Sequence, residues 1–89
     1  MIRITVVAQT EEEVVLKVAG WVSGTDVAIL EVEGDRYLQQ VRRLVLDLKG
    51  VRFIDDAGIR LLQRWSGERL VLCGASPFLQ SLLEAHGVV

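Results

Sequence analysis

The 89 residues carry ten Lys or Arg against twelve Asp or Glu, for a formal net charge of −2, and 51% of them are hydrophobic. This composition excludes a disordered chain, and the length supports one domain over residues 1–89. The two charge signs are interspersed, which excludes a basic stripe for nucleic acid and a polybasic patch for anionic lipid. No apolar run reaches the ~18 residues that cross a bilayer, the acidic start is unlike a signal peptide, and one cysteine fits a reducing compartment. We therefore expect a cytoplasmic protein without direct membrane insertion.

The first part of the chain predicts two strands and a helix. Residues 2–7 and 14–19 have the composition of strands, and the short polar break between them favours an antiparallel hairpin. Residues 23–26 are typical of a turn that leads into a helix cap, and a helix follows over about 25–40. Residues 29–33 also alternate as a strand would, and Gly34 costs roughly 1 kcal/mol inside a helix. We favour the helix, with a bend at Gly34 left open, because a parallel strand after it needs a long crossover.

The central stretch, LVLDLKGVRFIDDAGIRLLQRW over residues 44–65, predicts a strand followed by a helix. Residues 44–48 form a buried-type strand, Lys49 and Gly50 turn the chain, and residues 51–54 continue extended. Two carboxylates, Asp55 and Asp56, precede apolar residues at helical spacing, so we expect a helix over 56–66. The start of a helix offers unpaired N–H groups and about half a positive charge, which makes it a site for anions and partners.

The last part predicts one more strand and one more helix. Residues 69–73 are a buried-type strand, and Ser76 with Pro77 is a typical N-cap and first helical residue. The helix ends at Gly87, and Val88 and Val89 could begin a further strand. The order β-β-α-β-α-β-α predicts an α/β fold, a mixed sheet of about four strands with helices packed mainly on one face. The third and fourth strands should each lie parallel to a neighbour.

The pattern Leu44-Val45-Leu46-Asp47-Leu48-x-x-Val51-x-Phe53-Ile54-Asp55-x-x-Gly58-Ile59-x-x-Leu62 resembles the signature of the STAS domain family. This family includes bacterial anti-sigma factor antagonists, stressosome proteins and the cytoplasmic tails of sulfate transporters. The resemblance covers nearly the whole chain and implies the SpoIIAA-like fold. It also implies a non-enzymatic signalling module in transcription regulation.

Two departures from the family pattern matter. In antagonists that are phosphorylated, the acceptor is the serine just before the glycine, and that position is Ala57, which has no hydroxyl. The position before it, often Ser or Thr, is Asp56. The resemblance also leads us to expect a domain that is short at its C-terminus, since the family usually continues into another strand and helix. Uncovered apolar surface would favour a partner, and a homodimer stays open.

The two carboxylates have a structural and a functional interpretation. One of them caps the helix and both complement its dipole, worth about 1 kcal/mol for the cap. Alternatively, Asp56 places a fixed negative charge on the family's recognition surface. Cys73 and His86 supply too little for a metal or nucleophilic site, so we expect no metal, cofactor or catalytic residue. Trp21 and Trp65 are interpreted as core or rim packing.

The resemblance implies a partner-binding surface made by two segments. The first is the loop of residues 23–26 and the second is the start of the central helix; together they comprise Ser23, Gly24, Thr25, Asp26, Asp55, Asp56, Ala57, Gly58, Ile59 and Arg60. The implied partner is an anti-sigma factor with a histidine-kinase-like fold. An alternative stays open, because STAS subunits of ABC-type lipid transporters have an Asp-x-Ala-Gly motif and bind the transporter ATPase.

Overall fold

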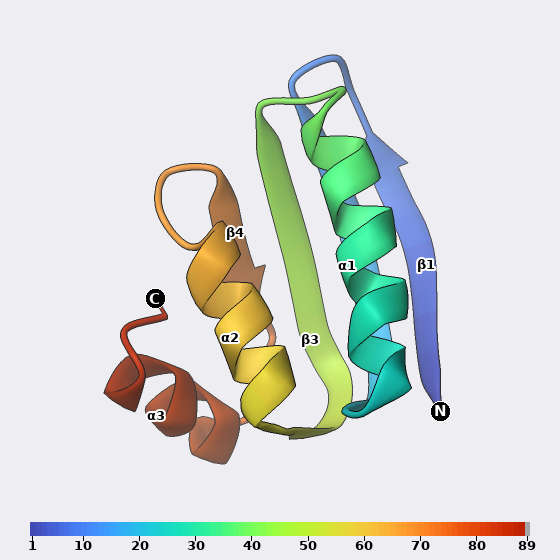
Figure 1. Ribbon diagram of the computed structural model, residues 1–89. Coiled ribbons are helices and arrows are strands. Elements are labelled where there is room, and N and C mark those ends of the chain that lie inside the picture. Colours follow the sequence, from blue (N-terminus) through green and yellow to red (C-terminus); the bar gives the residue numbers. More distant parts are fainter. Residues whose placement is uncertain (89) are drawn as a thin grey trace.

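The computed structural model describes residues 1–88 and confirms the predicted order of elements (Figure 1). The elements are β1 (Ile2–Gln9), β2 (Glu13–Val22), α1 (Thr25–Leu38), β3 (Arg43–Ile54), α2 (Asp56–Trp65), β4 (Leu70–Cys73) and α3 (Pro77–Ala85). Val88 is buried but belongs to no strand, and Val89, the second residue of the suggested further strand, lies outside the described residues.

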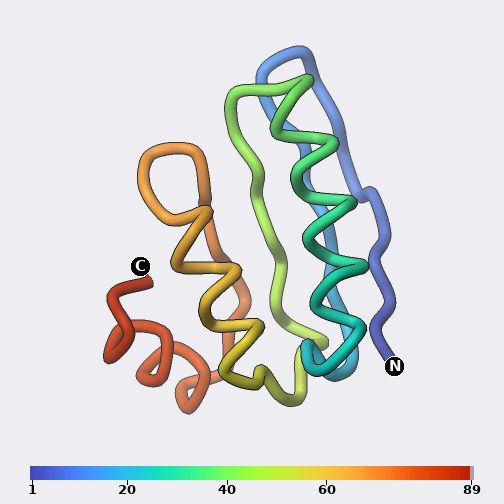
Figure 2. Tube along the Cα trace, viewed as in Figure 1, coloured from blue at the N-terminus to red at the C-terminus, as the bar shows by residue number. Residues whose placement is uncertain are grey.

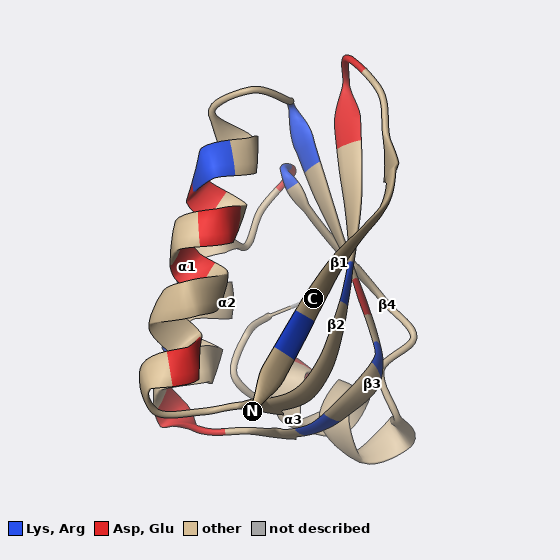
Figure 3. Cartoon of the chain, turned by 90° about the vertical axis from the view of Figure 1, so that its right-hand side faces the viewer, with Lys and Arg blue, Asp and Glu red and all other residues tan. Residues whose placement is uncertain are grey.

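The four strands form one mixed sheet in the order β1-β2-β3-β4. β1 pairs antiparallel with β2, whereas β3 lies parallel to both β2 and β4. The hairpin and the two parallel neighbours are therefore confirmed. Helices α1 and α2 cover one face of the sheet, and α3 lies at the β4 side (Figures 1 and 3).

The core lies between this covered face and the two helices. Alternate residues of the central strands are fully buried, with their neighbours at least partly exposed, as a period of two requires. Leu30 of α1 and Leu62 of α2 close the core from above. Each buried leucine contributes about 1.5–3 kcal/mol of transfer free energy. The buried strand residues on this face include Val14, Leu16, Val18, Val22, Leu44, Leu46 and Leu48.

The turn predicted at Lys49 and Gly50 is wrong, because β3 continues through both residues as one strand of 12. The register with β2 advances by two residues from Lys17 to Ala19 but by three from Asp47 to Gly50, so β3 carries one extra residue there. The side chain of Asp47 accepts a hydrogen bond from the Lys49 N–H at 2.9 Å. This local contact lies at the bulge. The Lys-Gly composition of the bulge is that of a turn, which explains the prediction.

α1 is one helix of 14 residues, so the alternative strand over residues 29–33 is excluded. It ends at Leu38, two residues before the predicted end. The glycine inside it has a packing role: a Cβ on Gly34 would lie 2.2 Å from Cη2 of Trp65. Gly34 therefore lets the indole of α2 approach the α1 backbone, which offsets its low helix propensity.

α3 begins and ends as predicted. The Ser76 hydroxyl accepts a hydrogen bond from the Leu79 N–H at 3.2 Å, and Pro77 occupies the first turn. Gly87 has a φ of 76°, and the Val88 N–H donates to the Leu83 carbonyl at 2.8 Å. Such a left-handed residue closes the last turn and satisfies carbonyls that would otherwise lack partners.

Candidate partner-binding site

The two predicted segments meet at one end of the molecule. Since β2 and β3 are parallel, both end at the same edge of the sheet, and α1 and α2 begin there (Figure 2). The Asp55 N–H donates to the Val22 carbonyl at 3.1 Å, which continues the β2–β3 pairing up to the start of α2. The loop of residues 23–26 and the start of α2 are thus adjacent, as the resemblance implies.

Asp55 joins the two helix starts. Its backbone is extended, with φ −88° and ψ −178°, and its Oδ1 accepts a hydrogen bond from the Gly58 N–H at 2.8 Å as the N-cap of α2. Its Oδ2 accepts a second bond from the Gly24 N–H at 2.9 Å. These two bonds, the one from Gly24 first, lower the pKa of Asp55 from its ordinary value. The cap interpretation is therefore confirmed for Asp55.

The start of α1 has no side-chain cap of its own. The N-cap is Gly24, with a φ of 57°, and neither Ser23 nor Thr25 bonds the free N–H groups of the helix. The expected turn is present, because the Asp26 N–H donates to the Ser23 carbonyl at 3.1 Å. A carboxylate 31 positions later, Asp55, holds this loop instead, and local sequence patterns do not reveal such a contact.

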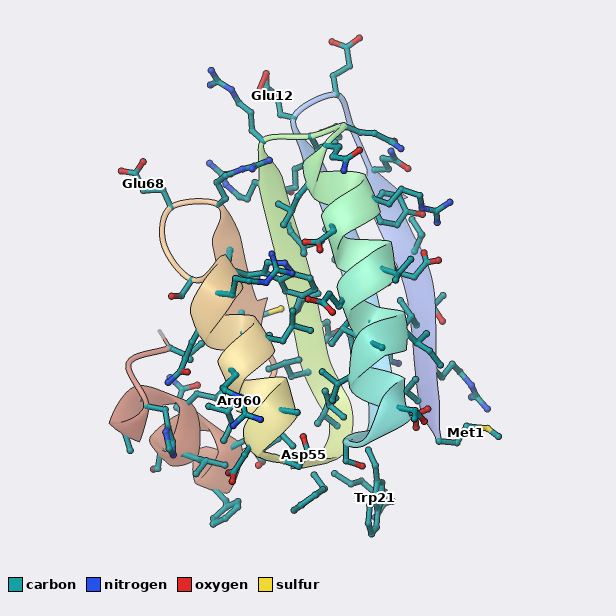
Figure 4. The ribbon with its side chains drawn as sticks, viewed as in Figure 1. Met1, Glu12, Trp21, Asp55, Arg60 and Glu68 are labelled. Carbon is teal, nitrogen blue, oxygen red and sulfur yellow. The ribbon has the colours of Figure 1, made fainter. Side chains whose placement is uncertain are left out.

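The exposed part of the α2 start is Asp56, Ala57 and Arg60. Asp56 and Arg60 are exposed, and Ala57 is half-buried; Figure 4 shows Asp55 and Arg60 at this end of the molecule. Ala57 and Arg60 line a shallow groove between α1 and α2, together with Val27 of α1. The face therefore presents a carboxylate, a methyl group and a guanidinium within two helical turns.

Gly58 and Ile59, also predicted on this surface, are buried. A Cβ on Gly58 would lie 2.7 Å from Cγ2 of Ile54 and 2.9 Å from the carbonyl oxygen of Val22. Ile59 is 5% exposed and belongs to the core. Both residues hold α2 close to the sheet, since a glycine here permits a backbone approach that any side chain would block. They support the surface from below.

A charged cluster between α1 and α2 was missed at the sequence level. Arg64 donates to Asp35 at 2.9 Å and to Glu31 at 3.0 Å, and the Trp65 indole N–H donates to Asp35 at 2.8 Å. Burial acts to raise the pKa of Asp35, but the bonds from Trp65 and Arg64 outweigh it and the pKa is lowered. In the sequence, Glu31 and Asp35 are one helical turn apart, which places two carboxylates on one face of α1. This spacing does not identify Arg64 as the residue that bonds them. This cluster fixes α2 against α1.

The two tryptophans, the cysteine and the histidine lie in different environments. Trp65 is buried in the core as predicted, whereas Trp21 is 54% exposed. Cys73, predicted at the end of a buried strand, is exposed, because β4 has no neighbour beyond it and its outward face is uncovered. His86 follows α3 as its C-cap. Residues 1–88 contain no group of three or more metal-ligating side chains, and none of their helices is long and apolar enough to span a membrane.

Comparisons with known proteins agree with this arrangement. A family model described as Mlab, STAS domain matches residues 5–89. The anti-sigma factor antagonist SpoIIAA in its unphosphorylated form is similar in structure, with a TM-score of 0.68 and 19% identity over 92% of this chain and 82% of that chain. An anti-sigma-factor antagonist STAS domain from Rhodobacter sphaeroides has a TM-score of 0.62 and 18% identity over 82% and 86%. No curated protein matches. At these identities the solved structures show a shared fold.

Proposed function

We propose that this chain, which belongs to the STAS domain family, is a non-enzymatic bacterial regulator that binds another protein in the cytoplasm through the start of α2 and the loop of residues 23–26. The observation that carries the proposal is the double hydrogen bond of Asp55, which joins the loop to the helix. A surface held in advance loses less conformational entropy on binding than a mobile one.

The proposed partner is an anti-sigma factor with a histidine-kinase-like fold. Support comes from the fold shared with two anti-sigma factor antagonists. Because Ala57 has no hydroxyl, the proposed regulator is not switched by phosphorylation at this position. Asp56 supplies a permanent charge beside it, so we propose that control comes from expression or from the partner.

A second candidate is a STAS subunit that binds the ATPase of an ABC-type lipid transporter. The observation that favours it is the run Asp55-Asp56-Ala57-Gly58, which resembles the Asp-x-Ala-Gly form of those subunits, and the family description Mlab is compatible with it. In this case the same surface would support assembly of the transporter.

Affinity capture from the native host, with the whole chain as bait, tests the proposal and separates the two candidates. A kinase-like anti-sigma factor supports the first candidate, and a lipid-transporter ATPase supports the second. The affinity of the captured protein is then measured for Asp56→Asn. We expect at least about a tenfold loss of affinity, or 1.4 kcal/mol. Asp56 is exposed and has no ion pair within residues 1–88, so its charge is available to a cation of the partner.

Glu68→Gln is the matched control, since Glu68 is an exposed carboxylate far from the α2 start (Figure 4). Both variants should melt within a few degrees of the wild type, because exposed substitutions usually change the free energy of unfolding by about 0.5 kcal/mol or less. Equal affinities for the wild type and both variants would remove Asp56 from the binding surface and contradict the proposal.

A further inference from the structure

The face of the sheet opposite α1 and α2 carries a second, distinct surface. Figure 3 shows mostly red Asp and Glu segments along α1, and blue as well as red segments on the strands. Arg3 of β1, Lys17 of β2 and Arg52 of β3 are all exposed. Three cations that are far apart in the sequence therefore share one face of the sheet.

An aromatic pair, Trp21 and Phe53, lies on this uncovered face. The two residues are register partners in β2 and β3, with ring centroids 5.4 Å apart and an interplanar angle of 53°. They are 54% and 45% exposed. Figure 4 shows Trp21 directed away from the body of the molecule. Large aromatic side chains left in water are unusual and mark interaction sites.

A bulge at Arg52 creates the pair. The register advances from Gly20 opposite Val51 to Trp21 opposite Phe53, so Arg52 is an extra residue in β3. Without it, the alternation that buries Val51 would also bury Phe53 and expose Ile54. With it, Ile54 is 4% exposed and Phe53 is turned outward beside Trp21. A bulge disrupts the ladder, and such features commonly re-aim a side chain.

The cations near the pair have no partners among the described residues. Ion pairs within residues 1–88 use the amino terminus, Arg36, Arg42, Arg43 and Arg64. Arg3 and Arg52 line one shallow hollow together with Ala19 and Gly50. Lys17 lies on the same face, since its neighbours Leu16 and Val18 point into the core.

We propose that this face docks an acidic segment of another protein. We define the cationic sheet face as Arg3, Lys17, Trp21, Arg52 and Phe53. Its guanidinium and ammonium groups pair with carboxylates, while Trp21 and Phe53 pack against the apolar side chains between them. Aromatic and Arg side chains dominate the affinity of most protein interfaces.

A protein partner fits better than a membrane or a nucleic acid. A flat anionic bilayer would bring its phosphates against Asp47, which lies on this face, and against Asp55 and Asp56 at its end. A nucleic acid gains its affinity from many neutralised phosphates, and three cations on a chain of net charge −2 provide few. A protein segment can place each carboxylate opposite a cation and leave Asp47 in water.

Site-specific photocrosslinking in the native host tests this proposal on the whole chain. The crosslinking residue p-benzoylphenylalanine replaces Phe53, and the matched control carries it in place of Phe78, which is also an exposed phenylalanine. We expect a protein adduct at position 53 that maps by mass spectrometry to a segment rich in Asp and Glu. Trp21→Ala should reduce its yield at least about tenfold.

Charge reversal provides the second readout. Arg3→Glu and Lys17→Glu should each reduce the adduct several-fold, whereas Arg42→Glu, at an 87% exposed cation near the opposite end of the sheet, should not. The proposal is overturned by no adduct at position 53, by equal adducts at positions 53 and 78, or by an adduct to lipid, nucleic acid, a second copy or a segment without acidic residues. Because Phe53 lies two residues before Asp55, the crosslink is repeated in Asp56→Asn. An adduct that this variant leaves unchanged belongs to the sheet face, whereas loss of the adduct would assign it to the α2 surface and overturn the proposal.

Discussion

Asp55→Ala tests whether one carboxylate holds both helix starts. The substitution removes the N-cap of α2, worth about 1 kcal/mol. It also removes a charge-assisted bond to the Gly24 N–H, worth about 1.5 kcal/mol. The sum is about 2.5 kcal/mol, which corresponds to a decrease in Tm of about 10–20 °C for a domain of this size.

The assay is thermal and urea unfolding followed by circular dichroism, with Asp56→Ala as the control. Asp56 interacts with the helix dipole but caps nothing, so its removal should cost about 0.5 kcal/mol. Hydrogen exchange should show faster exchange at Gly24 and Gly58 in Asp55→Ala alone. Similar losses of stability in the two variants would refute the structural role that we assign to Asp55.

Three further predictions concern stability. Because folding lowers the pKa of Asp55, the ionised carboxylate stabilises the fold fully above its ordinary pKa of 3.8, and this stabilisation is lost as pH falls through the lower folded value. The free energies of unfolding of wild type and Asp55→Asn, measured by urea titration, should therefore converge as pH falls below 3.8. Gly34→Ala should lower the free energy of unfolding in urea by about 1–2 kcal/mol and red-shift Trp65 fluorescence, since the clash outweighs the gain in helix propensity; a more stable variant would contradict this packing. Gly58→Ala should destabilise by about 2 kcal/mol, because the new methyl meets the Val22 carbonyl, and an unchanged Tm would show that α2 can move away from the sheet.

The periodicity of apolar residues and the residues typical of helix caps were sufficient to predict the strands and helices and their order. The alternation of β2 and β3 and the Ser76–Pro77 start of α3 depend on residues within one turn or one strand of each other, so the sequence displays them directly. The error at Lys49 and Gly50 has the same origin. A Lys-Gly pair after an apolar run has the composition of a turn, and only the neighbouring strand shows that the chain continues as a bulged strand.

The site was predictable in position but not in its contacts. The pattern of apolar residues predicted a strand-to-helix junction at Asp55, and the structure confirms it there. The bond from Gly24 to Asp55 spans 31 positions, and those from Arg64 to Glu31 and Asp35 span 33 and 29. Such pairings depend on which helix faces meet, and the spacing of residues within one helix does not identify the residue on the other. The burial of Ile59 likewise follows from how α2 is turned toward the sheet.

The bulge at Arg52 links the two proposed surfaces. The extra residue in β3 places Ile54 in the core. It thereby turns the preceding side chain, Phe53, to the outer face, and it sets the position of the next residue, Asp55. Phe53 is turned toward Trp21 on the uncovered face, while Asp55 reaches Gly24 and Gly58 at the end of the covered one. The acidic helix start and the cationic sheet face are thus consequences of the same local register. The two proposed surfaces thus lie on different sides of the last residues of β3, where Phe53 and Asp55 are two positions apart.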